Sequence, residues 1–208
     1  MPADPLPLFP LPGFLLYPEA VVPLHLFEPR YCQMMADMVQ AGEERMVICA
    51  LRPGYEPHYF DAPPVYEIGG VGRVLTCCRL DDGRWNIVLQ GERRVRVLRE
   101  PSSGRLYRRV QVMELPEPPI DAARAAELRA RLDSALCTLL GADLLLPDEA
   151  GAGYLADVLL LQLPLSLPER HALFALVDPE LRSERVLQAF ASCGCCGTPP
   201  AGQHPERN

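Results

Sequence analysis

Apolar and polar positions alternate through the first half of the chain, which is the pattern of half-buried β-strands. Runs of this kind, rich in β-branched residues, predict at least five short strands. Pro23 lies within the first run and predicts that this strand occupies a sheet edge or a bulge, because proline cannot donate to a strand ladder. The runs cover residues 21–26, 46–51, 66–80, 85–97 and 106–115.

One segment of this half has the 3.6-residue period of a helix instead. It covers residues 28–40, with Pro29 suited to the first turn and Gly42 in the place of a C-terminal glycine cap. Its apolar stripe consists of Tyr31, Met34, Met35 and Met38. Its polar face consists of Arg30, Gln33 and Asp37. The helix is therefore expected to pack one face on the strands.

The two longest strand runs are joined by Asp81, Asp82 and Gly83, which predicts a hairpin turn. Gly69-Gly70 and Gly72 interrupt the first of these runs, as expected at a bulge or a barrel corner. Short strands of this kind with one early helix predict a small, strongly curved sheet or barrel.

The second half of the chain has helical periodicity between about residues 121 and 190. Asp121 is a predicted N-cap for a helix that runs to about Leu140, and three more helices cover roughly 153–163, 166–176 and 178–190. The predicted fold class is therefore α+β, with four segments. These are a β subdomain (1–115), a proline-rich hinge (116–120), a helical subdomain (121–191) and a Cys/Gly/Pro-rich tail (192–208) expected to be disordered.

The composition excludes several mechanisms. The 208 residues contain 20 arginines and no lysine. A P-loop, a Schiff base and a Ser-Lys dyad each require a lysine, so none of these can be present. Hydrophobic content of 49% with 23% charged residues is typical of a globular domain.

Several motifs in a fixed order resemble the N-terminal, substrate-binding domain of Lon proteases in its stand-alone form. They occur between about residues 7 and 190, which is nearly the whole chain. The motifs are Pro10-Leu11-Pro12-Gly13, Tyr17-Pro18, Val22-Pro23-Leu24, Phe27-Glu28-Pro29-Arg30-Tyr31, Gly70-Val71-Gly72-Arg73-Val74, Gly91-Glu92-Arg93-Arg94-Val95-Arg96-Val97 and Leu163-Pro164-Leu165-Ser166-Leu167-Pro168-Glu169-Arg170.

This resemblance implies a PUA-like, six-stranded β pseudobarrel followed by a C-terminal, four-helix bundle-like subdomain. In Lon proteases an ATPase domain and a Ser-Lys peptidase domain follow. Because both chemistries need a lysine, we expect neither here. The expected function is non-enzymatic recognition of unfolded or partly folded protein segments, or of a partner protein, without a cofactor.

Two groups of residues are candidates for this binding surface. Glu28, Arg30 and Gln33 at the start of the early helix are expected to line a groove beside the barrel. Phe14 and Tyr17 belong to an N-terminal arm with more large apolar side chains than one strand needs. The alternatives are a solvated helix face for the first group and barrel packing for the second.

A cluster of arginines is the basis of an RNA-binding alternative. The cluster consists of Arg93, Arg94, Arg96, Arg99, Arg105, Arg108 and Arg109. Against Glu92 and Glu100 it gives this stretch a local charge of +5, although the whole chain carries −7. Arg94 and Arg96 alternate with valines, however, which is the normal pattern of an outward strand face. Nucleic acid is therefore not the expected partner.

The cysteines suggest a second alternative, a metal- or thiol-dependent protein. Cys193, Cys195 and Cys196 provide three thiols within four residues, but a zinc site needs four ligands and wider spacing. Adjacent Cys77 and Cys78 are expected on opposite strand faces, and Cys32, Cys49 and Cys137 in apolar surroundings. With no secretory signal and no membrane-spanning run, we expect a cytoplasmic protein without a membrane or metal partner.

Overall fold

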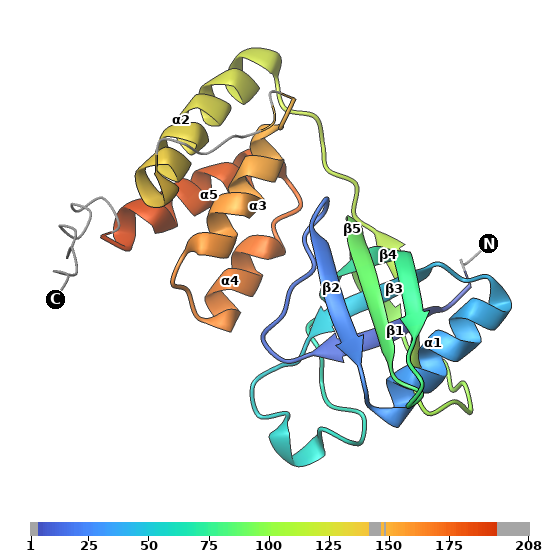
Figure 1. Ribbon diagram of the computed structural model, residues 1–208. Helices are drawn as coiled ribbons and strands as arrows, with labels where there is room; N and C mark the ends of the chain where they lie inside the picture. The colour runs from blue at the N-terminus through green and yellow to red at the C-terminus, as the bar shows by residue number, and fades with distance from the viewer. Residues whose placement is uncertain (1–3, 142–146, 148, 195–208) are drawn as a thin grey trace, which may run out of the picture. The chain divides into compact units, whose positions relative to one another are not determined.

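The computed structural model describes residues 4–141, 147 and 149–194. Contacts within the chain divide it into two compact units (Figure 1). Unit 1 comprises Met1–Pro119 and Ser166–Asp178, and unit 2 comprises Ile120–Leu165 and Pro179–Asn208. The predicted α+β class is confirmed, since a six-stranded sheet with one early helix precedes a set of helices.

Unit 1 is built on a sheet with the strand order β2-β5-β4-β3-β1-β6. Strand β6 also pairs with β5, so five strands close into a barrel and β2 remains at an edge. Pro23 lies in this edge strand, as predicted. Only β1 and β3 pair in parallel among the described strands. The strands are β1 Leu6–Leu11, β2 Val21–Leu26, β3 Arg45–Ala50, β4 Ile68–Arg79, β5 Trp85–Arg99 and β6 Arg108–Glu114.

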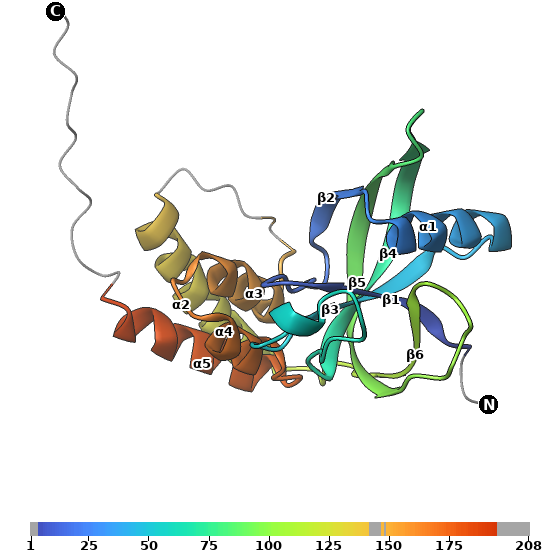
Figure 2. The same cartoon turned by 90° about the horizontal axis from the view of Figure 1, so that it is seen from below.

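Helix α1 (Pro29–Ala41) packs beside this sheet (Figure 2). Gly42 adopts a left-handed backbone (φ 66°), and its N–H caps the helix end, as predicted. The buried stripe of α1 joins one apolar cluster with residues of β2, β3 and β5. Its buried side chains are Tyr31, Met34, Met35 and Met38. The helix therefore contributes a methionine-rich face to the core and leaves its polar face outside.

Two glycines in the motifs are required by a close approach of backbone to backbone. A Cβ atom on Gly70 would lie 2.2 Å from the carbonyl oxygen of Leu16, and one on Gly91 would lie 2.0 Å from that of Tyr17. The segment after β1 therefore crosses β4 and β5 where no side chain fits. These motif positions serve the fold.

Helix α4 (Leu167–Phe174) belongs to unit 1, although it lies within the 121–191 segment. The predicted N-cap is confirmed by a capping box between Ser166 and Glu169. His171 Nε2 lies 2.9 Å from the Ile68 carbonyl oxygen, and the His171 ring stacks on Tyr66 with centroids 3.9 Å apart. The sequence division at 115, 120 and 191 remains a prediction.

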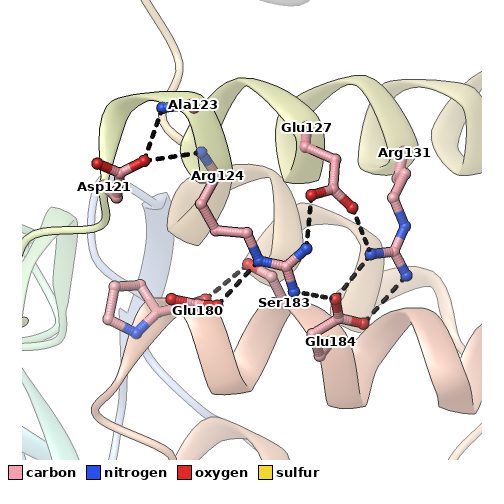
Figure 3. Close-up of polar contacts among 9 residues, drawn as sticks. Asp121, Ala123, Arg124, Glu127, Arg131, Glu180, Ser183 and Glu184 are labelled. Carbon is pink, nitrogen blue, oxygen red and sulfur yellow. Dashed lines mark hydrogen bonds and ion pairs between the residues drawn. The ribbon is translucent and has the colours of Figure 1, made fainter.

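Unit 2 contains the helices α2 (Ala122–Leu140), α3 (Ala152–Gln162) and α5 (Pro179–Ser192). Asp121 caps α2 as predicted, accepting hydrogen bonds from the backbone N–H groups of Ala123 and Arg124 (Figure 3). None of the helices in the described ranges combines the length and apolar character that crossing a bilayer requires.

A network of ion pairs joins α2 to α5 on the surface of unit 2 (Figure 3). Arg124 contacts Glu127, Glu180 and Glu184, and Arg131 also contacts Glu127 and Glu184. These hydrogen bonds raise the pKa of Arg124 and lower the pKa of Glu184. The network thus shares the carboxylates of Glu127 and Glu184 between the two arginines.

Candidate functional site

The polar face of α1 positions two loops of unit 1. Arg30, Gln33 and Asp37 lie on this face at the i, i+3, i+7 spacing that brings residues of a helix together. The first loop joins β3 to β4 and contains a short 3₁₀ helix, Glu56–His58. The second joins β5 to β6. The face was expected either to line a groove or to be solvated, and the structure shows it occupied by these loops.

The first loop is held by Glu28, Arg30 and Tyr59, which we call the clamp. Tyr59 donates from its hydroxyl to Glu28 Oε1 (2.6 Å). Arg30 donates from Nε to Glu28 Oε2 (3.0 Å) and from Nη1 to the Tyr59 carbonyl oxygen (3.1 Å). Because Glu28 is the N-cap of α1 and has an extended backbone, it meets Arg30 even though two helical residues at this spacing would not.

Aromatic rings enclose the charged centre of the clamp. The guanidinium carbon of Arg30 lies 4.7 Å from the ring centroid of Tyr31 and 4.9 Å from that of Tyr59. Burial, and the hydrogen bond to Glu28, raise the pKa of Tyr59, while burial raises the pKa of Tyr31 strongly. Both phenols therefore remain neutral at physiological pH.

The clamp leaves the neighbouring aromatic residue outside. Phe60 follows Tyr59 directly and is 84% exposed, the highest value among the described large apolar residues. Its ring contacts Tyr59 edge-on, with centroids 5.2 Å apart, and Tyr59 in turn contacts Tyr55. Fixing Tyr59 therefore fixes where Phe60 is presented. This segment is the teal loop at the lower edge of Figure 1.

The second loop is held one helical turn further along α1. Gln33 Oε1 accepts a hydrogen bond from the backbone N–H of Leu106 (3.2 Å), and Asp37 pairs with Arg105 Nη1 at 2.6 Å. The side chain of Leu106 is 67% exposed. Each loop on this face thus presents one large apolar residue to solvent.

The remaining predicted site residues lie elsewhere. Phe14 is partly buried against the apolar cluster that contains Tyr31. Tyr17 is 2% exposed and packs edge-on against Phe174, so it is a core residue and not part of the exposed surface. Sequence reasoning missed Tyr59, Phe60 and Leu106. The signal that could have found two of them is the cluster of aromatic residues inside a proline-bounded loop.

The arginine cluster is largely neutralised by carboxylates. Five of its seven members form ion pairs: Arg93–Glu114, Arg94–Glu117, Arg105–Asp37, Arg108–Glu100 and Arg109–Glu43. Arg94 corrects the expectation of an outward strand face, because it is buried and its Nε donates to the Phe174 carbonyl oxygen. Helix α4 covers this position. Such pairing leaves little positive potential for a nucleic-acid backbone.

The cysteines do not gather into a site in the part of the chain that the structure describes. No group of three or more potential metal ligands occurs there. Cys49 is buried, which raises the pKa of its thiol to about 12, while Cys32 and Cys137 are partly buried. Cys77 and Cys78 are both exposed, because the end of β4 extends into solvent. Cys195 and Cys196 of the predicted Cys193–Cys196 site lie outside the described residues.

Comparison with known proteins identifies the family of this chain and several of its relatives. Residues 5–191 match the family model described as the ATP-dependent protease La (LON) substrate-binding domain. The chain is 30% identical over 199 residues to Lon protease 2 of Sorangium cellulosum, which covers 89% of this chain and 24% of that protein. It is 27% identical over 193 residues to Lon protease 2 of Herpetosiphon aurantiacus. The chain thus spans about a quarter of the length of these relatives.

Solved structures agree with this placement. A Lon N-terminal domain protein from Xanthomonas campestris superposes with a TM-score of 0.67 at 27% identity, covering 89% of this chain and 98% of that one. The N-terminal domain of a Mycobacterium avium complex Lon protease gives the same TM-score at 19% identity, which supports the fold alone.

Proposed function

We propose that this chain, which belongs to the family of Lon substrate-binding domains, recognises exposed apolar segments of other proteins. We also propose that it carries out no reaction itself. The observation that supports this most directly is the exposed Phe60 on a loop fixed by the clamp. A large aromatic side chain held in solvent offers apolar area at a low cost in conformational entropy.

The predicted site residues have two roles in this proposal. Glu28, Arg30 and Gln33 are positioning residues that hold the two loops, and Phe60 and Leu106 contact the bound segment. Phe14 remains a proposed contact of lesser exposure. The absence of lysine supports a role without ATP hydrolysis or Ser-Lys peptide cleavage by these residues.

We also propose a cytosolic location. The six described cysteines are all free thiols, and free thiols are typical of proteins in reducing compartments.

Capture of an unfolded protein tests the proposed function. A reduced and alkylated model protein is immobilised beside its folded parent, and we expect the chain to be retained only by the unfolded form. The double substitution Phe60→Ser/Leu106→Ser should weaken retention about tenfold, since it removes two apolar contacts that become buried when the unfolded protein binds. Leu98→Ser, at an exposed leucine of β5, is the matched control and should leave retention unchanged. Equal retention by both forms, or none, contradicts the proposal.

A further inference from the structure

The charged side chains that belong to the loop on either side of Phe60 are acidic. Two arginines from outside the loop, Arg30 and Arg108, reach its backbone at the carbonyl oxygens of Tyr59 and Pro63, and each is paired with a carboxylate, Glu28 and Glu100 respectively. Glu56 and Asp61 are both exposed, and no arginine lies between residues 53 and 67. His58 Nδ1 lies 3.9 Å from Asp61 Oδ2, which is a contact of two largely exposed groups. The third carboxylate nearby, Glu28, is already bonded to Arg30 and Tyr59. The tip of the loop therefore combines one exposed aromatic ring with two carboxylates available to a ligand.

The backbone that carries these groups is held by bonds within the chain itself. Tyr59 is tied to α1 through its hydroxyl and its carbonyl oxygen, and Asp61 N–H donates to the His58 carbonyl oxygen at 3.0 Å. A fixed pattern of one apolar group and flanking charges discriminates among ligands, because wrong charges are repelled rather than accommodated.

We propose that this loop, residues 55–61, is a docking element that selects an apolar side chain flanked by lysine or arginine. This inference rests on the proposed function and names its preferred class of segment. Phe60 contributes apolar contact, while Glu56 and Asp61 attract the basic flanks. Charge complementarity supports a basic ligand at two scales, since the loop tip is acidic and the whole chain carries a net charge of −7.

Two fluorescent peptides with the same Phe/Leu core test the inference, one with arginine on both sides and one with glutamate. We expect fluorescence anisotropy to show about fivefold tighter binding of the arginine-flanked peptide at low salt. This preference should fall sharply at about 1 M salt, where the Debye length is about 3 Å. A core flanked by serine provides the neutral reference.

Three variants separate the contributions. Phe60→Ser should weaken both peptides about tenfold. Glu56→Gln/Asp61→Asn should keep the binding of the serine-flanked peptide and reduce the arginine preference to below about twofold. Leu98→Ser is the control for the loss of an exposed apolar residue at another place. Because all these positions are exposed, their thermal unfolding should match that of the unchanged chain, which circular dichroism verifies.

The possible failures are distinguishable. If the peptides bind but Glu56→Gln/Asp61→Asn leaves the arginine preference unchanged, the docking element is wrong and the proposed function stands. The same conclusion follows if Phe60→Ser binds as tightly as the unchanged chain. If neither the peptides nor the unfolded protein bind at all, the proposed function itself fails.

Discussion

Each of the two units buries an arginine, and the two arginines are compensated differently. In unit 1, Arg94 is 1% exposed, donates to the Phe174 carbonyl oxygen and pairs with Glu117, whose side chain remains 36% exposed. In unit 2, Arg182 is 0% exposed, and its Nε lies 3.1 Å from Oδ1 of Asp157, which is itself buried. Arg94 thus pairs with a carboxylate that water reaches, and Arg182 with one that water does not.

This difference shows what each arginine does for its unit. Arg94 ties a remote segment to the barrel, because Phe174 ends α4 and its ring lies 4.8 Å from the guanidinium carbon. Arg182 joins α5 to α3 inside a single helical cluster. The clamp at Arg30 follows the first pattern, since it also fixes a loop distant in sequence. In unit 1, therefore, Arg94 and Arg30 each attach one remote segment to the rest of the unit, whereas in unit 2 Arg182 is part of the core.

The largest effect is expected from Arg182→Met, which leaves the Asp157 carboxylate buried without its arginine. Breaking a buried ion pair from one side costs about 3–5 kcal/mol. Urea unfolding followed by circular dichroism, with hydrogen exchange in α3 and α5, measures the loss. Arg182→Met/Asp157→Leu is the control and should recover much of the stability, because it removes both charges. A double variant as unstable as the single one would show that the stranded charge is not the cause.

Arg94→Met should cost less, about 2 kcal/mol, because Glu117 is already partly hydrated. The variant loses hydrogen bonds to a charged group and the contact of the guanidinium with the Phe174 ring. The loss should be concentrated in α4, where amide hydrogen exchange accelerates while α3 and α5 stay protected. Arg96→Met is the matched control, since Arg96 lies two residues along the same strand and is exposed. If exchange rises equally in both units, Arg94 is not a tie for α4.

The same two arginines mark where sequence reasoning succeeds and where it stops. Alternation correctly placed the strand that contains Arg94, and proline and glycine signals placed α1 and α4. Alternation also predicted Arg94 on an outward face, which is wrong because a helix 80 residues further along the chain covers that face. A strand pattern reports which side a residue occupies, and it does not report what later segment packs there.

The candidate site follows the same rule. The sequence singles out Glu28 and Arg30 because the start of a helix is a local signal, and their role in binding stays a prediction. Their partner Tyr59 lies 29 residues from Arg30, and nothing in the spacing predicts the meeting. Tyr17 was selected because it is large and apolar, but the same property places it in the core. Exposure and long-range pairing are tertiary properties, so the exposed Phe60 emerged only from the structure.

The packing of α4 on the barrel of unit 1 is also expected to depend on pH, through His171. Burial lowers the pKa of His171 below its ordinary value of 6.5, with Arg52 acting in the same direction and the bond to the Ile68 carbonyl oxygen opposing it. The neutral ring is therefore favoured in the folded state. Its contribution to stability is complete above about pH 6.5 and is lost as the pH falls through the lower, folded-state pKa.

We therefore expect the protection factors of the α4 amides, which correct for the intrinsic exchange rate, to fall between neutral pH and about pH 5. The change should be smaller than that caused by Arg94→Met. His171→Gln keeps a donor for the Ile68 carbonyl oxygen and should remove the pH dependence specific to α4. Persistence of this dependence in the variant would assign it to another group.

The smallest effect is expected from the surface network of unit 2, which sharpens the contrast with Arg182. Glu184→Gln removes one shared carboxylate, but Arg124 retains Glu127 and Glu180, and Arg131 retains Glu127. Because the network is hydrated and each arginine keeps a partner, the loss of stability should be about 0.5 kcal/mol. It should disappear at about 1 M salt, whereas the Arg182→Met loss should persist, since a buried pair is screened little. Urea unfolding at low and high salt measures the loss of stability in each variant. A salt-independent loss for Glu184→Gln would mean that the network behaves like a buried ion pair and not like a hydrated one.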